Sequence, residues 1–250
     1  MPRLAVLIDA ENAQLSILGS LLAEIAKSGT PTVRRVYGDF TCTALASWRE
    51  QMLRYSIHPI QQFRNTVRKN ASDSALIIDA MDLLHTGRFE GFCIVSSDSD
   101  FTRLASRLRE EGMLVYGYGE KHTPMSFISA CDKFTYTEIL RRPENDQPEA
   151  PPVVVHKNAL GQSSDFVRLI VDAVESCADD SGWAALAAVG KVLSNHTPDF
   201  DPRHFGHKKL SDLVQATGQF ELGRRGNDGT SPLYVKLKST PSELSNSTSS

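Results

Sequence analysis

Short apolar runs alternate with amphipathic segments through the first 140 residues of the chain. The runs have the length of strands, and their nearly continuous apolar character is typical of strands buried on both faces of a parallel sheet. They lie at residues 4–8, 33–37, 57–63, 91–95, 114–118 and 134–139. Between them, apolar residues recur three and four positions apart, which predicts helices. These helices are expected at residues 17–27, 44–54, 73–84, 101–111 and 126–130.

This alternation predicts an α/β fold, with a Rossmann-like parallel sheet flanked by helices over residues 1–140. Pro59 lies inside the third run, and a proline cannot donate a hydrogen bond to a neighbouring strand, so we expect that strand at the edge of the sheet. Right-handed crossovers gather the carboxyl ends of parallel strands at one edge. Side chains that follow different strands are therefore expected to meet there.

A second, smaller unit is predicted after residue 140. Residues 141–160 are polar and rich in proline, which is typical of a semi-rigid linker. Helical spacing then returns in three segments, at residues 166–177, 182–193 and 208–216. Two apolar segments flank a connection that contains glycine and arginine and favour a β-hairpin, at residues 220–222 and 233–237. Three helices and a hairpin predict a winged-helix domain at residues 161–238, followed by a disordered tail at residues 239–250.

Composition excludes some classes of protein and leaves others open. The net charge of −3 neither favours nor excludes nucleic acid, so any basic surface must be local. The four cysteines form no Cys-x-x-Cys pair, which argues against a zinc site and fits a reducing compartment. No apolar run resembles a signal segment or a membrane span, so we expect a cytoplasmic protein without membrane association. A nucleotide P-loop motif is also absent from the sequence.

Carboxylates follow two of the predicted strands. Asp9 ends the first strand, and the run at residues 91–95 leads directly into Ser-Ser-Asp-Ser-Asp, which contains Asp98 and Asp100. Ligands of open α/β sheets bind beyond the carboxyl ends of strands. Two unit charges about 4 Å apart repel by about 4 kcal/mol at an effective dielectric near 20, so a cluster of carboxylates needs a cation or shifted pKa values. Mg²⁺ and Mn²⁺ prefer such oxygen ligands.

Each of these residues also has a structural explanation. Asp98 or Asp100 could cap the helix that follows, Asp73 could favour the positive end of a helix, and Asn12 could be a turn residue. Asp79 lies on a helix that is apolar nearly all round, so its carboxylate needs a partner. That partner could be Lys69, a backbone N–H group or a metal ion.

Three motifs of the first unit resemble those of NYN domains, which belong to the PIN-like nuclease superfamily and include the LabA-like bacterial proteins. They are Ile-Asp-Ala-Glu-Asn at residues 8–12, Lys-Asn-Ala-Ser-Asp at residues 69–73 with Asp79 six residues later, and Ser-Ser-Asp-Ser-Asp-Phe at residues 96–101. The resemblance implies a PIN-like fold, a divalent-metal pocket and endoribonuclease activity. The metal and catalytic residues that it implies are Asp9, Asp73, Asp98 and Asp100, with Asn12 as a further catalytic residue. The supporting pocket residues are Ser97, Lys69 and Asp79, and Ser97 stands where the family often has glycine.

The segment Phe-Gly-His-Lys-Lys-Leu-Ser-Asp-Leu-Val at residues 205–214 resembles the core of the OST-HTH, or LOTUS, domain, with His207 in place of the usual tyrosine. The resemblance implies RNA binding, although some members instead recruit protein partners. A predicted helix N-terminus with lysines nearby suits phosphate. The candidate RNA-binding residues are Gly206, His207, Lys208, Lys209, Arg224, Arg225, Arg64 and Arg68. Ordinary solvated lysines and arginines are the alternative.

We therefore expect an endoribonuclease that depends on Mg²⁺ or Mn²⁺, in which water activated by the ion attacks an RNA phosphodiester bond. The linker would hold RNA bound by the second domain at a high effective concentration near the pocket. A non-catalytic RNA-binding adaptor with a vestigial acidic pocket is the alternative. A phosphohydrolase of small molecules is a third reading, which leaves the second domain unexplained. A protein partner of the LOTUS domain and self-association remain open.

Overall fold

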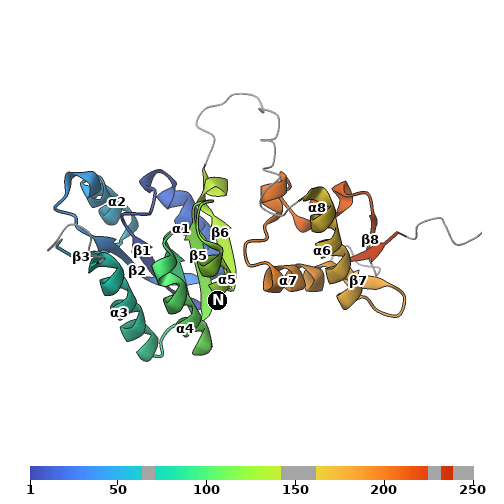
Figure 1. Ribbon diagram of the computed structural model, residues 1–250, viewed down its shortest axis with the longest axis horizontal. Coiled ribbons are helices and arrows are strands. Elements are labelled where there is room, and N and C mark those ends of the chain that lie inside the picture. The colour runs from blue at the N-terminus through green and yellow to red at the C-terminus, as the bar shows by residue number, and fades with distance from the viewer. Residues whose placement is uncertain (64–70, 142–161, 225–231, 239–250) are drawn as a thin grey trace, which may run out of the picture. The chain divides into compact units, whose positions relative to one another are not determined.

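The computed structural model describes residues 1–63, 71–141, 162–224 and 232–238. The chain divides into two compact units, the first containing strands β1 to β6 and the second containing helix α6 to strand β9 (Figure 1). No helix in these described ranges has both the length and the apolar character that crossing a membrane requires.

A six-stranded parallel sheet forms the centre of the first unit, as the sequence pattern predicts. Its strands are β1 (Arg3–Asp9), β2 (Thr30–Gly38), β3 (His58–Gln61), β4 (Gly91–Val95), β5 (Leu114–Gly119) and β6 (Lys133–Tyr136). Their order across the sheet is β3-β2-β1-β4-β5-β6. Strand β3, which contains Pro59, lies at an edge as expected. The chain builds outward in opposite directions from β1 and from β4, so the topological switch point lies between these two strands.

Helices cover both faces of this sheet. They are α1 (Leu18–Ser28), α2 (Trp48–Tyr55), α3 (Ala71–His85), α4 (Thr102–Glu110) and α5 (Met125–Ala130). Apolar side chains of α1 and α2 share one core with Val6 and Ile8 of β1, and those of α3, α4 and α5 share another with Ala5 and Leu7. Because side chains alternate along a strand, Asp9 faces the same side as Ala5 and Leu7, which is the side of α3 and α4.

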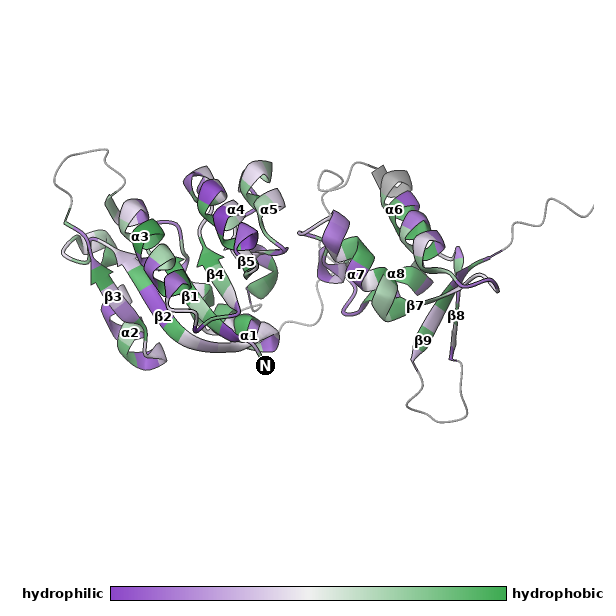
Figure 2. Cartoon of the chain, turned by 90° about the horizontal axis from the view of Figure 1, so that it is seen from below, coloured by the Kyte–Doolittle hydropathy of each residue, from purple (hydrophilic) through white to green (hydrophobic). Residues whose placement is uncertain are grey.

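The boundaries of some elements differ from the expected ones. The helix expected at residues 44–54 is a short 3₁₀ helix, Thr43–Leu45, followed by α2 from Trp48. The last strand ends at Tyr136, and the chain continues into a 3₁₀ helix, Thr137–Leu140. Leu140 is buried in the core beneath α1, so this turn also contributes to packing. Strand β4 is buried at every position and is apolar along its length (Figure 2).

The second unit combines helices with a small antiparallel sheet. Its elements are α6 (Gln162–Cys177), β7 (Trp183–Ala185), α7 (Leu186–His196), α8 (Leu210–Ala216), β8 (Phe220–Arg224) and β9 (Leu233–Leu237). The sheet has the order β7-β9-β8. The two predicted hairpin strands, β8 and β9, are therefore paired, and β7 pairs with the other side of β9.

The expectation that a helix begins at residue 182 is wrong. Gly182 has a φ of 77°, in the left-handed region, which ends a turn rather than starting a helix. The Asp179 carboxylate accepts a hydrogen bond from the Trp183 backbone N–H at 3.1 Å and so shapes this turn. Residues Trp183–Ala185 then pair with β9, and the helix starts only at Leu186.

Candidate metal centre

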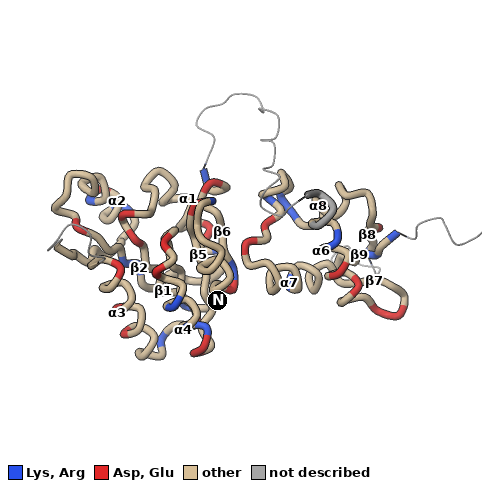
Figure 3. The backbone as a smooth tube through the Cα atoms, in the orientation of Figure 1, with Lys and Arg blue, Asp and Glu red and all other residues tan. Residues whose placement is uncertain are grey.

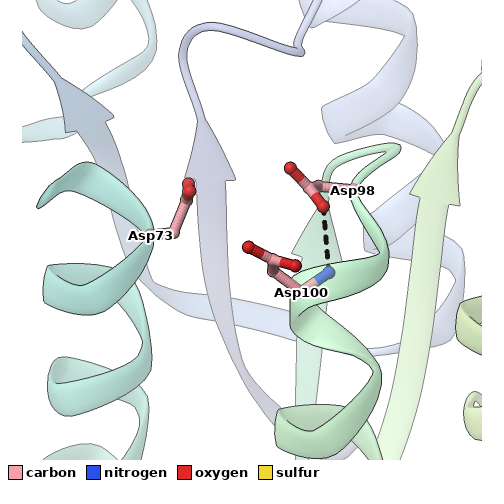
Figure 4. Close-up of side chains that lie close together, drawn as sticks. All are labelled: Asp73, Asp98 and Asp100. Carbon is pink, nitrogen blue, oxygen red and sulfur yellow. Dashed lines mark hydrogen bonds between the residues drawn. The ribbon is translucent and has the colours of Figure 1, made fainter. Parts of the chain in front are cut away.

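The loop after β4 brings two carboxylates to the carboxyl edge of the sheet. Asp98 is the N-cap residue of a 3₁₀ helix, Ser99–Phe101, which leads into α4. Its Oδ1 accepts a hydrogen bond from the Asp100 backbone N–H at 2.9 Å (Figure 4). Capping by Asp98 is therefore confirmed, and this hydrogen bond keeps Asp98 and Asp100 next to each other.

Asp73 completes a group of three carboxylates. It lies in the first turn of α3, where its half-buried side chain points toward the loop after β4 (Figure 4). Asp73, Asp98 and Asp100 each offer an oxygen atom, and these three atoms lie within 4.8 Å of one another. Asp98 is half-buried and Asp100 is exposed, so the group opens to solvent. We refer to these three residues as the acidic triad.

Asp9 is not one of the three residues of the triad, although its charge acts on Asp73, and its role as a metal ligand stays a prediction. Only 1% of Asp9 is exposed, and its carboxylate is held by three donors. The Asn12 side-chain amide donates to Oδ2 at 2.6 Å, the Ser96 hydroxyl donates to Oδ2 at 2.9 Å, and the Glu11 backbone N–H donates to Oδ1 at 3.0 Å. Asn12 lies in the turn after β1, as one reading of the sequence expected, and its amide also holds the Asp9 carboxylate, while its catalytic role stays a prediction.

The two serines before Asp98 have different contacts. The Ser96 hydroxyl donates to Asp9 and accepts from the Asp98 backbone N–H at 3.1 Å, so it joins the ends of β1 and β4 across the switch point. The Ser97 hydroxyl instead accepts a hydrogen bond from the Glu120 backbone N–H at 2.8 Å and joins β4 to β5. Sequence reasoning selected Ser97 and missed Ser96. The available signal was that Ser96 directly follows the last residue of the buried strand.

Burial and mutual repulsion raise the pKa values of Asp9 and Asp73. The positions of the acidic residues along the backbone are red in Figure 3. Burial, followed by the negative charges of Asp9, Asp98, Glu11 and Asp100, raises the pKa of Asp73 to about 6. Burial also raises the pKa of Asp9, while its hydrogen bonds act in the opposite direction. Like charges that face one another favour the protonated form of one of them. A cation would relieve the same repulsion.

The donor set fits a hard divalent cation. The triad offers three carboxylate oxygens close enough together to share one ion, and its exposed side leaves room for water or a phosphate group. Mg²⁺ and Mn²⁺ bind such oxygen sites, whereas zinc prefers nitrogen and sulfur ligands. Asp73, Asp98 and Asp100 are therefore the residues that would hold the ion.

The Asp79 carboxylate bonds to two side chains of β2, and Asp79 is not part of the triad. Its carboxylate accepts hydrogen bonds from the Arg35 guanidinium and from the Tyr37 hydroxyl, both on β2. Arg35 and Tyr37 are two residues apart, so they lie on the same face of the strand, the face that α3 covers. The need for a partner was predicted correctly, and Arg35 and Tyr37 are two partners that the sequence did not suggest. Lys69, one of the three partners suggested by the sequence, lies outside the described residues.

The candidate RNA-binding residues fall into two groups. Gly206 has a φ of 79° and ends a 3₁₀ helix, and Lys208 and Lys209 follow it as exposed side chains. Helix α8 begins at Leu210 with Lys209 as its N-cap residue, so both lysines lie at its N-terminus and the phosphate site stays a prediction. His207 is half-buried, and Arg224 is exposed at the end of β8. The other candidates lie outside the described residues: Arg64, Arg68 and Arg225.

Comparison with known proteins adds two family matches. The family model of the NYN domain matches residues 3–140, and that of the OST-HTH/LOTUS domain matches residues 161–232. None of the curated proteins matches the sequence.

Two solved structures are also similar. A Vibrio parahaemolyticus protein of unknown function, VPA0982, is 17% identical, with a TM-score of 0.45 over 53% of this chain and 91% of its own. An uncharacterised Nitrosomonas europaea protein from locus NE0665 is 34% identical, with a TM-score of 0.28 over 38% of this chain and 94% of its own. Both TM-scores are too low to inform the fold or the function.

Proposed function

Because the chain belongs to the NYN-domain family, within the PIN-like nuclease superfamily, and because its acidic triad lies at the switch point of the sheet, we propose that it is an endoribonuclease dependent on Mg²⁺ or Mn²⁺. The single observation that carries this proposal is the convergence of Asp73, Asp98 and Asp100 from two separate elements. A bound divalent cation supplies Lewis-acid chemistry, which lowers the pKa of water and offsets charge on the phosphate.

The residues of the chain provide the remaining parts of the site. The triad positions the ion and, through the exposed Asp100, remains accessible to a phosphodiester from solvent. Asp9 adds a buried negative charge behind the triad, and Asn12 and Ser96 keep its carboxylate oriented. Such outer partners fix the geometry and basicity of the ligands that they contact.

The second domain supports RNA as the substrate. The OST-HTH/LOTUS match covers residues 161–232, and Lys208, Lys209 and Arg224 are exposed there. We propose that this domain binds RNA and that residues 141–160 tether it to the nuclease domain, which raises the effective concentration of bound RNA at the triad.

An RNA-binding adaptor without catalysis is the second candidate, and one observation favours it. The Asp9 oxygens are engaged by Asn12, Ser96 and the Glu11 backbone, so they do not join the triad. An acidic pocket with three ligands and a fully bonded fourth carboxylate could persist for structural reasons.

Cleavage assays separate the two candidates. The substrates are single-stranded and structured RNA, with Mn²⁺, Mg²⁺ or EDTA, and the enzymes are the wild-type chain and Asp98→Asn. We expect metal-dependent cleavage that falls by at least about 100-fold in Asp98→Asn, because a ligand of the ion is removed. Asp82→Asn is the matched control, since Asp82 is exposed on α3 away from the triad. RNA binding without turnover under every metal condition would favour the adaptor.

A further inference from the structure

The residues around the acidic triad are negatively charged, and so is an RNA backbone. The charges of Asp9, Asp98, Glu11 and Asp100 all act on Asp73. An RNA strand adds a negative charge with each phosphate, so repulsion opposes its approach to these carboxylates. A divalent ion at the triad attracts the phosphate that it contacts, whereas the neighbouring phosphates gain most from positive side chains nearby. Such side chains must be exposed and must lack carboxylate partners.

Arg103 comes shortly after the loop that carries Asp98 and Asp100. Asp100 is in the 3₁₀ helix that leads into α4 (Figure 4). Arg103 follows it by three residues, in the first turn of α4, and residues three apart on a helix lie on the same side with Cβ atoms about 5–6 Å apart. Arg103 is exposed, and none of the described residues forms an ion pair or a hydrogen bond with its guanidinium. A positive charge is therefore free beside the triad.

The other two arginines of α4 have carboxylate partners. Arg107 lies one turn further along the helix, with its guanidinium nitrogens 3.3 Å from Oε2 of Glu110 and 2.5 Å from Oε1 of Glu111. Nε of Arg109 is 3.1 Å from Oδ1 of Asp132. Among the described residues, the arginine nearest to the triad is therefore the one of the three that lacks a carboxylate partner.

Lys121 places a second exposed cation at the end of the next strand. It lies two residues after Gly119, in a turn closed by two hydrogen bonds to the Glu120 carbonyl, from the Thr123 backbone N–H at 2.9 Å and the Thr123 hydroxyl at 2.6 Å. The Lys121 backbone N–H donates to Oε1 of Glu138 at 2.9 Å, so the backbone is fixed on both sides. Its ammonium group has no partner in the part of the chain that the structure describes. We refer to Arg103 and Lys121 as the rim cations.

Both rim cations lie on the same side of the triad. Asp73 is on α3, which packs against β1 and β2, whereas α4 packs against β5 and Lys121 follows β5. Because the sheet has the order β2-β1-β4-β5 in this part, the triad has α3 on one side and the rim cations on the other.

We propose that Arg103 and Lys121 bind the RNA phosphates next to the one at the triad, so that the strand runs from the triad over the carboxyl ends of β4 and β5. A guanidinium can donate two parallel hydrogen bonds to one phosphate, and an ammonium acts as a point charge. The proposal rests on the proposed function, since it takes RNA as the ligand of the first domain.

Binding measurements on the full-length chain test the two contacts without any need for cleavage. Affinity for a labelled 12-nucleotide oligouridine is measured by fluorescence anisotropy in EDTA. We expect Arg103→Ala and Lys121→Ala each to weaken binding by about 2- to 5-fold, the range of an exposed contact between opposite charges. The slope of log affinity against log salt concentration should become shallower by about 0.7 for each lost phosphate contact. Thermal unfolding reports whether each variant stays folded.

Arg88→Ala is the matched control. Arg88 is exposed and has no partner among the described residues, but it precedes β4 and therefore lies at the opposite edge of the sheet. Its removal changes the net charge by the same amount and should leave affinity and salt slope unchanged. Equal losses of affinity in Arg88→Ala and in the two rim variants would overturn the proposal, and so would unchanged affinity in both rim variants.

Cleavage kinetics with Mn²⁺ provide the second readout. Both rim variants should raise KM more than they lower kcat, because the lost contacts hold neighbouring phosphates rather than the reacting one. Arg103→Lys keeps the charge without the forked guanidinium and should recover part of the loss. A fall in kcat with unchanged KM would overturn the assignment to neighbouring phosphates.

The outcome is separable from that of the nuclease proposal. Weaker binding by both rim variants, without cleavage by the wild-type chain, would keep the rim contacts and remove the nuclease. Cleavage that depends on Asp98, together with wild-type affinity and KM in both rim variants, would do the reverse.

Discussion

Ser96 is the residue on which the order of the acidic site depends most directly. Its buried hydroxyl contacts both the Asp9 carboxylate, at the end of β1, and the backbone of Asp98, three residues beyond the end of the neighbouring strand β4. A single hydroxyl therefore relates the position of the buried carboxylate to that of the triad. Ser97, one residue later and also buried, makes no corresponding contact and instead accepts from Glu120.

Substitution of Ser96 and Ser97 should separate an effect on the orientation of the Asp9 carboxylate from an effect on stability. We expect Ser96→Ala to lower kcat for RNA cleavage by about 10-fold or more, because an outer partner of the site is removed. Ser97→Ala should lower stability by about 1 kcal/mol and leave kcat within about 2-fold, since it removes one neutral hydrogen bond away from Asp9. Steady-state kinetics and chemical denaturation measure both. Equal losses of kcat in the two variants would contradict the role given to Ser96.

Asp73 should make cation binding dependent on pH. Its pKa is raised to about 6, so the folded chain holds this proton more tightly than the unfolded chain does. The stability that this group contributes is present below its unfolded pKa, near 4, and is lost as pH rises through about 6. Cation binding needs the deprotonated form, so Mn²⁺ affinity should rise between about pH 5 and pH 7, with release of about one proton per ion at the acidic end.

Calorimetric titration with Mn²⁺ in two buffers of different ionisation enthalpy measures that proton. Asp73→Asn should bind the ion more weakly and with little dependence on pH across the same range. A wild-type affinity that stays constant from about pH 5 to pH 7 would exclude Asp73 as the titrating ligand.

At the scale of the elements, helix α3 carries Asp73 at its start and Asp79 one to two turns later. Asp79 bonds to Arg35 and Tyr37 of β2, while Leu76, Ala80 and Leu83 of the helix are buried in the core. The ion pair therefore fixes the rotation of α3 against the sheet, and with it the direction in which Asp73 points. On this view Asp79 is a positioning residue that acts through the helix.

Removal of this anchor should affect stability first. We expect Asp79→Asn to destabilise the first domain by about 1–3 kcal/mol, because it weakens charged hydrogen bonds at a partly buried site. Asp82→Asn, on the exposed side of the same helix, should change stability by no more than about 0.5 kcal/mol. The double variant Arg35→Met/Asp79→Leu should recover part of the loss, because no charge is left unpaired. Urea denaturation compares the three, and equal stability of Asp79→Asn and Asp82→Asn would refute the anchor.

At the scale of the whole molecule, the chain joins a nuclease-type domain to a domain of an RNA-associated family. The net charge of the chain is −3, so affinity for RNA must come from local groups. Lys208 and Lys209 are exposed and adjacent in the second domain, whereas the acidic triad belongs to the first. On the proposed function, this division assigns capture of RNA and its cleavage to different domains.

Charge reversal in the second domain tests this division. We expect the double variant Lys208→Glu/Lys209→Glu to raise KM for RNA by about 10-fold or more and to leave kcat nearly unchanged, since cleavage occurs elsewhere. The slope of log affinity against log salt concentration should also become shallower, by about 0.7 for each phosphate of a single strand that the protein no longer neutralises. Lys191→Glu, at an exposed position on α7, is the control for charge alone. A matching rise of KM in that control would show that these two lysines have no special role.

The amino-acid sequence by itself determined the parallel sheet, the position of Pro59 in an edge strand, and the delivery of Asp98 and Asp100 to the end of β4. These features follow from local patterns, because a buried strand is a continuous apolar run and its polar successors must leave the sheet. The tertiary structure alone decided that Ser96 rather than Ser97 holds Asp9, and that Arg35 is the partner of Asp79. It also decided that Trp183 starts strand β7, which pairs with β9. Each of these contacts joins residues on neighbouring elements. The hydrophobic pattern of one segment does not determine which side chain of another segment will lie opposite it.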